Sequence, residues 1–129
     1  MIGFVGQYEH QMDPKGRVSL PSAFRRQAEG ERFVLMQWEK DNLTLFPQEK
    51  WEALQVELLD FRRKNPKGAN QLRRMVANAV EVVTDKQGRI LLPVHLRDYA
   101  ELGSEVIATG MGNRVELWSM ERWASTIGL

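Results

Sequence analysis

The sequence predicts an α+β protein in which one structural unit is written twice. Residues 13–21 (DPKGRVSLP) return as residues 85–93 (DKQGRILLP), and the shift between them is 85 − 13 = 72 residues. The same shift continues through identical pairs: Arg25 and Arg97, Val34 and Val106, Leu45 and Leu117, Trp51 and Trp123. Each copy contains alternating apolar stretches typical of strands, with a short helical pattern between them. A fixed shift of this kind indicates repeated supersecondary units, which we expect to share one core.

The first copy predicts strand, turn, strand, helix, strand, turn and strand in that order. Ser22 is placed to cap the short helix, and Gly30 to end it. The strand patterns cover residues 3–12, 17–20, 33–36 and 43–46. In the second copy, the expected strands are 80–83, 89–92, 106–108 and 115–118, with helices at 94–102 and 119–127 and Ser119 as the cap of the last helix.

Two helices are expected between the copies. Pro47 opens the first of them, a position where proline is tolerated. A break follows at residues 65–68, and a second helix leads into the strand at residue 80. The predicted organisation is therefore a first repeat at 1–51, a helical insert at 52–79, and a second repeat with a C-terminal helix at 80–129.

The repeated segment begins with a turn whose residues suit their positions. Asp13 and Asp85 fit the first position of a type I turn, where the carboxylate caps nearby N–H groups, and Gly16 and Gly88 fit a left-handed position. Forming such a turn does not require an arginine directly after the glycine. Yet Arg17 and Arg89 follow it in both copies. They are candidate functional residues; the alternative is an ordinary exposed charge, or an ion pair with the aspartate of the same turn.

Charge and composition exclude several classes of protein. The net charge is only +1, which argues against an indiscriminate nucleic-acid binder, but residues 61–80 contain six basic residues and no acid. A polarised molecule of this kind can present a cationic face to DNA. The role of this basic stretch (residues 62–74) stays open.

The residue types of known catalytic and metal sites do not assemble in this sequence. There is no cysteine, and the two histidines, His10 and His95, stand in different contexts without recurring acidic partners. We find no nucleophile–base set and no glycine-rich phosphate loop. We therefore expect no enzyme, no metal, no cofactor and no small-molecule substrate. Without a signal peptide or an apolar run of membrane-spanning length, we expect a cytoplasmic protein with no membrane partner.

The two turn motifs carry a resemblance to a known family. Two copies of D-x-x-x-R with glycine before the arginine, Pro21 and Pro93 after the strands, and E-x-W at residues 49–51 and 121–123 resemble the MraZ family across nearly the whole chain. These are bacterial transcriptional regulators with two AbrB-like half-domains in one chain. The resemblance implies a swapped-hairpin β-barrel formed by the two tandem repeats. Its pseudo-two-fold axis would set turn 13–16 beside turn 85–88 at one edge, with Arg17 and Arg89 pointing the same way.

The resemblance also implies a function in double-stranded DNA binding. Arg17 and Arg89 would be the main contacts, because a guanidinium can grip guanine or phosphate with two bonds, and Lys15 and Lys86 would contact the backbone. Gln87 stands where the first copy has Lys15, so we expect the second site to bind more weakly or differently.

Members of the family form rings that bind short direct repeats at the promoter of the cell-division and cell-wall gene cluster, and usually repress it. This implies a homo-oligomer located on the nucleoid. The candidates for the interface between subunits are Trp51, Leu54, Leu58, Phe61 and Trp123. The alternative to DNA binding is a protein-interaction module, either antitoxin-like or an assembly scaffold. The sequence contains no segment typical of an antitoxin's disordered tail, which makes this alternative weaker.

Overall fold

The computed structural model describes residues 3–128, so the outermost limits expected for the two repeats, residues 1 and 129, lie outside it. Its elements follow the predicted order. The first repeat contains β1 (Gln7–Gln11), β2 (Arg17–Ser19), α1 (Ser22–Arg25), the 3₁₀ turn η1 (Glu29–Glu31), β3 (Arg32–Met36) and β4 (Leu43–Pro47). Between the repeats lie the 3₁₀ turn η2 (Gln48–Lys50), α2 (Trp51–Lys64), the 3₁₀ turn η3 (Pro66–Gly68) and α3 (Ala69–Ala77). The second repeat contains β5 (Val80–Val83), β6 (Arg89–Leu91), α4 (Val94–Tyr99), β7 (Glu105–Gly110), β8 (Val115–Ser119) and α5 (Met120–Ile127).

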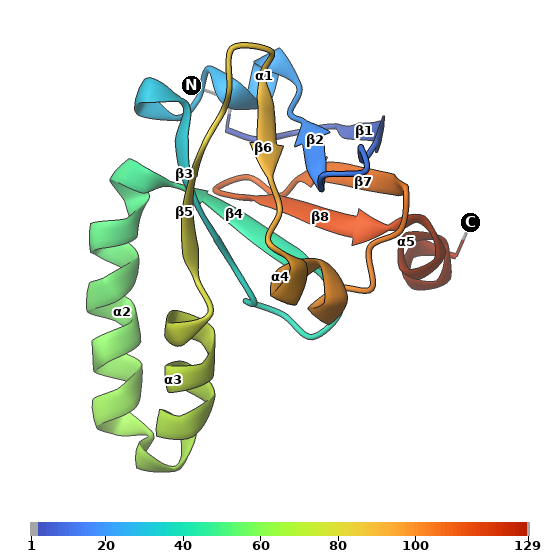
Figure 1. The fold of residues 1–129 in the computed structure, drawn as a ribbon. Helices are drawn as coiled ribbons and strands as arrows, with labels where there is room; N and C mark the ends of the chain where they lie inside the picture. The colour runs from blue at the N-terminus through green and yellow to red at the C-terminus, as the bar shows by residue number, and fades with distance from the viewer. Residues whose placement is uncertain (1–2, 129) are drawn as a thin grey trace.

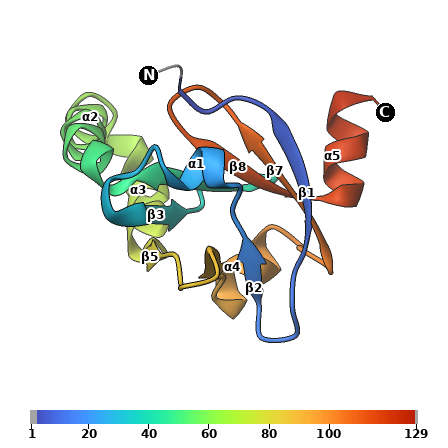
Figure 2. The same cartoon turned by 90° about the horizontal axis from the view of Figure 1, so that it is seen from above.

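The strands form one large sheet and one small ribbon, all antiparallel. The six-stranded sheet has the order β1-β7-β8-β4-β3-β5, and β2 pairs with β6 in a separate two-stranded ribbon (Figure 1). The helices α2 and α3 extend from one end of the sheet, and α5 lies at the other end (Figure 2). Within residues 3–128, no helix is both long and apolar enough to cross a membrane.

The two repeats exchange their first strands. Strand β1 of the first repeat pairs with β7 of the second, and β5 of the second repeat pairs with β3 of the first. Strands β4 and β8 then join the repeats at the centre of the sheet. The α+β fold with hairpins swapped between tandem repeats is therefore confirmed.

The ribbon lies on the pseudo-two-fold axis. Its central pair is Val18 with Ile90, two equivalent positions. Reciprocal backbone bonds flank it: the Leu20 N–H donates to the Gly88 carbonyl at 3.0 Å, and the Leu92 N–H to the Gly16 carbonyl at 2.9 Å. The two turns therefore lie at opposite ends of the ribbon. The expectation that they lie side by side is wrong, because an axis through the middle of an antiparallel pair separates the strand starts.

The main core fills the space between the sheet and the ribbon with equivalent residues from both repeats. Val18, Leu20, Phe24 and Ala28 have their counterparts in Ile90, Leu92, Leu96 and Ala100, and all eight are at most 4% exposed. A second, smaller cluster lies under the helical hairpin and contains Met36, Phe46, Leu54, Leu58 and Leu72.

Several element limits differ from the prediction for local reasons. Helix α1 ends at Arg25, and the backbone is already extended at Ala28 (φ −111°, ψ 129°). Left-handed residues at Gly30 (φ 64°) and Glu31 (φ 53°) then turn the chain into β3. Ser22 is the first helical residue and not the cap; its hydroxyl accepts a hydrogen bond from Arg26. Pro47 is the last residue of β4 and also the N-cap of η2, the 3₁₀ turn that leads directly into α2. Ser119 does cap α5, because its hydroxyl accepts the Arg122 N–H at 3.1 Å.

A buried carboxyl group lies where the two repeats meet in the sheet. Glu116 on β8 stands between Thr44 of β4 and Thr109 of β7 and is 4% exposed. Trp118 Nε1 donates to its Oε1 at 3.0 Å. Burial, and then the neighbouring Glu39, raise the pKa of Glu116 to about 7. A hydrogen bond from Glu116 in turn lowers the pKa of Glu39, so when the pair holds one proton, that proton resides mainly on Glu116.

Candidate nucleic-acid interface

The β2–β6 ribbon separates an apolar inner face from a polar outer face. Val18 and Ile90 point inward and are 1% and 0% exposed. Side chains alternate across a strand, so the neighbouring positions share the outer face: Arg17, Ser19, Arg89 and Leu91. Arg17 lies opposite Leu91, and Arg89 opposite Ser19, which makes the two arginines diagonal neighbours on one surface.

Each strand of the ribbon enters through the same turn. In the first, the Gly16 N–H donates to the Asp13 carbonyl at 2.9 Å, and Asp13 Oδ1 accepts the N–H groups of Lys15 and Arg17 at 3.0 and 2.8 Å. Gly16 has φ +88°, a left-handed value that disfavours any residue with a Cβ. The aspartate therefore holds the turn through the backbone.

The second turn reproduces this geometry. Asp85 Oδ1 accepts the N–H groups of Gln87 and Arg89, both at 2.9 Å, and Gly88 has φ +76°. The backbone hydrogen bonds from Arg17 and Arg89 are the main cause of the lowered pKa of Asp13 and Asp85, respectively. Both carboxylates are therefore ionised at neutral pH.

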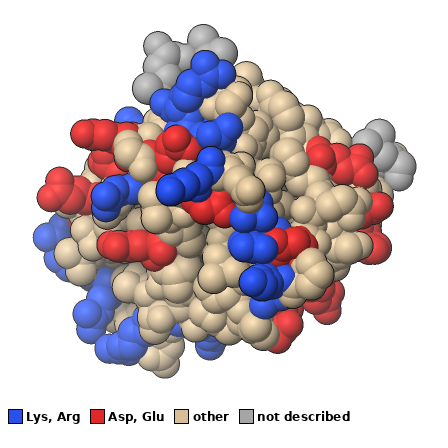
Figure 3. Space-filling view, turned by 45° about the horizontal axis from the view of Figure 1, so that its top comes forward, with Lys and Arg blue, Asp and Glu red and all other residues tan. Residues whose placement is uncertain are grey.

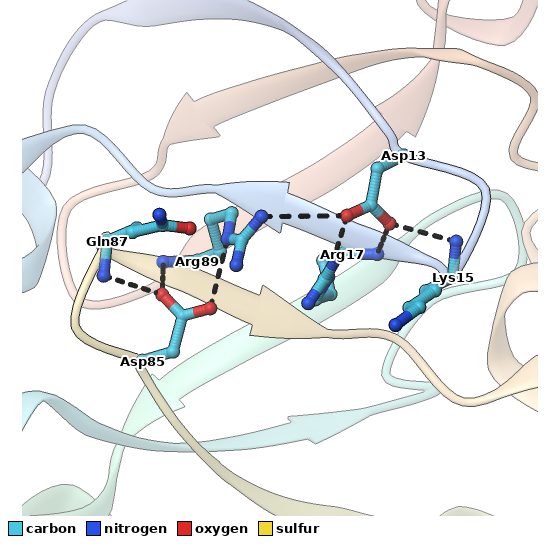
Figure 4. A network of polar contacts seen from close by, with 6 residues as sticks. All are labelled: Asp13, Lys15, Arg17, Asp85, Gln87 and Arg89. Atoms are coloured by element: carbon cyan, nitrogen blue, oxygen red, sulfur yellow. Dashed lines mark hydrogen bonds and ion pairs between the residues drawn. The ribbon is translucent and has the colours of Figure 1, made fainter.

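The ionised aspartates also hold the arginines (Figure 4). Arg17 Nε donates to Asp13 Oδ2 at 2.6 Å, and Arg89 Nε to Asp85 Oδ2 at 2.9 Å. Arg89 Nη1 lies 3.7 Å from Asp13 Oδ2, which links the two copies. The intramolecular ion pair considered as an alternative is thus present. The ion pair between Arg17 and Asp13 is made through Nε of the guanidinium. In the described part of the chain, the two terminal nitrogens of Arg17 have no hydrogen-bond partner.

The structure adds two arginines that the site prediction omitted. The guanidinium of Arg97 lies against Gly16, where an added Cβ would be 2.8 Å from its ζ carbon, and Arg25 lies in the same way against Gly88. Arg25 Nε also donates to the Leu20 carbonyl at 3.1 Å. Each arginine therefore packs on the turn of the other repeat. The 72-residue shift that pairs Arg25 with Arg97 was the available signal.

These two arginines differ in their surroundings. Arg25 Nη1 is 3.4 Å from the carboxylate of Glu31, which also accepts the Thr84 hydroxyl. The position equivalent to Glu31 in the second copy is Gly103, since 31 + 72 = 103. Arg97 Nε is buried without a hydrogen-bond partner within residues 3–128. Arg97, which packs on the first turn, is therefore less neutralised than Arg25, which packs on the second turn.

The lysines lie at the two ends of the ribbon because the turns do. Lys15 and Lys86 are both exposed. When the top of Figure 1 is tilted forward, the visible surface has a broken band of basic side chains with acidic side chains between them (Figure 3). This mixture agrees with the low net charge of +1.

The residues expected at a subunit interface fall into two groups. Leu54 and Leu58 are buried in the chain's own second core cluster, and Trp51 packs against that cluster. Trp123 is half-buried with its ring centroid 5.7 Å from that of Trp118. Phe61, by contrast, is 45% exposed. The predicted apolar stripe on α2 thus mainly holds the hairpin to the sheet.

The basic stretch lies on the helical hairpin, away from the ribbon (Figure 1). Its side chains at Arg62, Arg63 and Lys64 are exposed. Asp60 pairs with both Arg63 and Lys64. The stretch therefore forms a separate surface from the one that carries Arg17.

Comparisons with known proteins place the chain in a family. The model of a family described as "MraZ protein, putative antitoxin-like" matches residues 4–74 and again residues 75–127. A protein of Carboxydothermus hydrogenoformans named "Transcriptional regulator MraZ" is 42% identical over 120 residues, which cover 93% of this chain and 83% of that protein. Proteins of the same name from Leuconostoc mesenteroides and Herpetosiphon aurantiacus are 42% and 40% identical, over 95% and 96% of this chain and 85% and 86% of their own lengths. Two family matches in tandem agree with the two repeats, and the chain belongs to the MraZ family.

Proposed function

We propose that this chain is a sequence-specific DNA-binding transcriptional regulator that inserts the β2–β6 ribbon into the major groove. The observation that carries the proposal is the pair of arginines on the outer face of a two-stranded antiparallel ribbon. The major groove of B-DNA admits such a ribbon. The relatives named above are transcriptional regulators by name, which supports the same class of function.

Arg17 and Arg89 are suited to contact guanine. A guanidinium can donate two parallel hydrogen bonds to O6 and N7 of guanine. Because Asp13 and Asp85 hold the Nε atoms, each planar group is oriented before DNA arrives, and less side-chain entropy is lost on binding. The aspartates stay ionised and also repel phosphates, so the ribbon's contacts favour base edges over the backbone.

Lys15 and Lys86 are suited to phosphate contacts. Both are exposed at opposite ends of the ribbon, where the two sugar–phosphate strands would flank a ribbon lying in the groove. Such contacts position a protein without reading sequence. With a net charge of only +1, the chain has little non-specific attraction to DNA, so several weak sites must act together.

The hairpin supplies a surface for assembly into a ring. Four apolar side chains on α2 and α3 are 45–68% exposed: Val56, Leu59, Phe61 and Val76. A groove lined by Trp38, Leu58, Phe61, Leu72 and Met75 lies between the two helices. We propose that this surface contacts the next subunit, with the α5 side near Trp123 as its counterpart. A closed head-to-tail ring would present several ribbons to promoter direct repeats spaced by about one DNA turn.

Binding several repeats at once makes each later contact effectively intramolecular. A ring on the promoter of the chain's own division and cell-wall gene cluster would then repress it, and the protein would act in the cytoplasm on the nucleoid. The alternative is a protein-interaction module of the antitoxin-like kind.

The test is a gel-shift titration against the chain's own upstream promoter region, with mass by light scattering in parallel. Arg17→Ala and Arg89→Ala should each weaken binding about 5- to 150-fold, the range for one bidentate base contact of about 1–3 kcal/mol. Arg32→Ala is the matched control, because Arg32 is an exposed arginine on β3 outside the ribbon. Equal binding by all three variants would contradict the proposal. A stable oligomer that ignores this DNA would favour the interaction module.

A further inference from the structure

The outer face of the β2–β6 ribbon is chemically asymmetric, although its backbone is nearly two-fold symmetric. Ser19 and Leu91 occupy equivalent positions, since 19 + 72 = 91. Leu91 is 56% exposed beside Arg17, whereas Ser19 is half-buried beside Arg89. The two arginines therefore have different neighbours on the same surface.

The same asymmetry continues around the ribbon. Three further pairs of equivalent, exposed positions differ in character: Lys15 and Gln87, Ser22 and Val94, Arg26 and Asp98. The first copy presents cations and a hydroxyl, and the second presents an amide, an apolar group and a carboxylate. Because the ribbon is antiparallel, each of its ends combines side chains from both copies, and the two ends carry different chemical groups.

Packing in the core does not explain why an apolar residue stands at position 91. Its neighbours Ile90 and Leu92 are both 0% exposed and supply the inward packing of β6. Val94, at the first position of α4, is 60% exposed. Two exposed branched apolar side chains therefore stand close in sequence, and Leu91 lies opposite Arg17 at the end of the ribbon whose turn carries Lys15.

In the major groove, the C5-methyl group of thymine is the apolar feature that side chains read. We propose that Leu91, together with Val94, is a specificity-determining residue that contacts thymine methyl groups, so that one chain reads a site whose two halves differ. This inference rests on the proposed DNA-binding function. With this contact, the chain would bind an asymmetric DNA site in one orientation only, whereas a ribbon with two identical ends would bind in both orientations.

The spacing on the ribbon fits this assignment. Directly opposite side chains on antiparallel strands, such as Arg17 and Leu91, have Cβ atoms about 4.5–5.5 Å apart. Stacked bases follow one another at about 3.4 Å. A guanine read by Arg17 and a thymine read by Leu91 should therefore lie one or two base pairs apart.

The test replaces thymine by deoxyuridine, which removes only the methyl group. The probe is the shortest duplex from the chain's own upstream promoter region that the full chain binds and Arg17→Ala does not. At one or two thymines, the replacement should weaken wild-type binding about fourfold, the factor for one buried methyl-sized group. Leu91→Ala should weaken binding to the unmodified probe by a similar factor. The affinity of this variant should not change further when deoxyuridine replaces thymine at those positions.

Two variants serve as controls. Ser19→Ala changes the equivalent position of the first copy and should keep the sensitivity to deoxyuridine. Leu91→Met restores an apolar side chain and should restore that sensitivity. Because Leu91 is exposed, Leu91→Ala and Leu91→Met should melt like the wild type.

The outcomes separate this inference from the function on which it rests. If wild-type binding depends on Arg17 but no deoxyuridine replacement changes it, or if Leu91→Ala keeps the wild-type sensitivity, the assignment of Leu91 is wrong and the DNA-binding function stands. If no promoter probe shows binding that depends on Arg17, the proposed function fails, and the role of Leu91 with it.

Discussion

The buried Glu116 makes the stability of the fold depend on pH in an uncommon direction. Its pKa is raised from 4.5 to about 7 in the folded chain. A raised folded-state pKa means that the folded protein binds the proton more tightly than the unfolded chain does. The stabilisation is therefore complete below about pH 4.5 and is lost as the pH rises through about 7. As the pH rises from 5 to 8, the ionisation of Glu116 alone should lower the unfolding free energy of the protein.

The size of the effect follows from the shift. Raising the pKa from 4.5 to about 7, at about 1.36 kcal/mol for each pKa unit, corresponds to at most about 3.4 kcal/mol of unfolding free energy. The lowered pKa of Glu39 acts in the opposite direction and reduces this figure. Burial lowers the pKa of His10, which makes stability rise with pH over part of the same range. The quantity to measure is therefore the difference between wild type and Glu116→Gln, in which His10 is unchanged.

The assay is chemical denaturation at several pH values from 5 to 8. Glu116→Gln keeps an acceptor for Trp118 Nε1 but cannot ionise, so its advantage over wild type should grow by about 2–3 kcal/mol across this range. Glu81→Gln, on an exposed position of β5, should run parallel to wild type. A difference between wild type and Glu116→Gln that stays constant from pH 5 to 8 would refute the reasoning.

Three further predictions concern the turns, the hairpin and the DNA contacts. Gly16→Ala should lower the unfolding free energy by about 1–3 kcal/mol, because φ is +88° and the new Cβ would lie 2.8 Å from the guanidinium carbon of Arg97. Gly103→Ala is the control and should be neutral, because its Cβ would meet nothing within 4 Å. Equal melting curves for the two variants would contradict the turn geometry. Leu58→Ala should lower the unfolding free energy by about 2–4 kcal/mol, whereas Val83→Ala, at a 58% exposed position of β5, should change it very little. Denaturant titrations that give the same loss for both variants would argue against the second core cluster. If Lys15 contacts a phosphate, Lys15→Ala should reduce the slope of log affinity against log salt by about 0.9, and an unchanged slope would remove it from the DNA interface.

Much of the fold was predictable because the signals are local or periodic. The 72-residue shift, the alternation of apolar residues and the aspartate–glycine turns together predict the strands and the placement of Asp13 and Asp85. The exchange of strands between the repeats was expected from the resemblance to the family. Turn chemistry depends on four adjacent residues, so its signal survives in sequence. The limits of α1 and α4 were less predictable, because α1 gives way to extended backbone at Ala28 before Gly30, and α4 is followed by a left-handed residue, Glu101, that is not a glycine.

The remaining features depend on contacts between distant segments. The register of the ribbon, with Arg17 opposite Leu91, determines that the two turns separate while the arginines converge. The packing of Arg97 on Gly16 joins two repeats and has no local pattern. Glu116 lies in an alternating stretch that suggests an exposed charge, yet both neighbouring strands and Trp118 cover it.

The exchange of strands within one chain has a consequence for how the surface of the β2–β6 ribbon can evolve. Because β1 completes the sheet of the second repeat and β5 that of the first, neither repeat holds a full set of strands by itself. In an assembly of two identical chains, any substitution would appear in both halves at once. Here each half is encoded separately while the shared core holds them together. A change such as serine to leucine can therefore occur at one of two equivalent positions only. A symmetric ancestral surface can in this way become asymmetric without loss of the shared core.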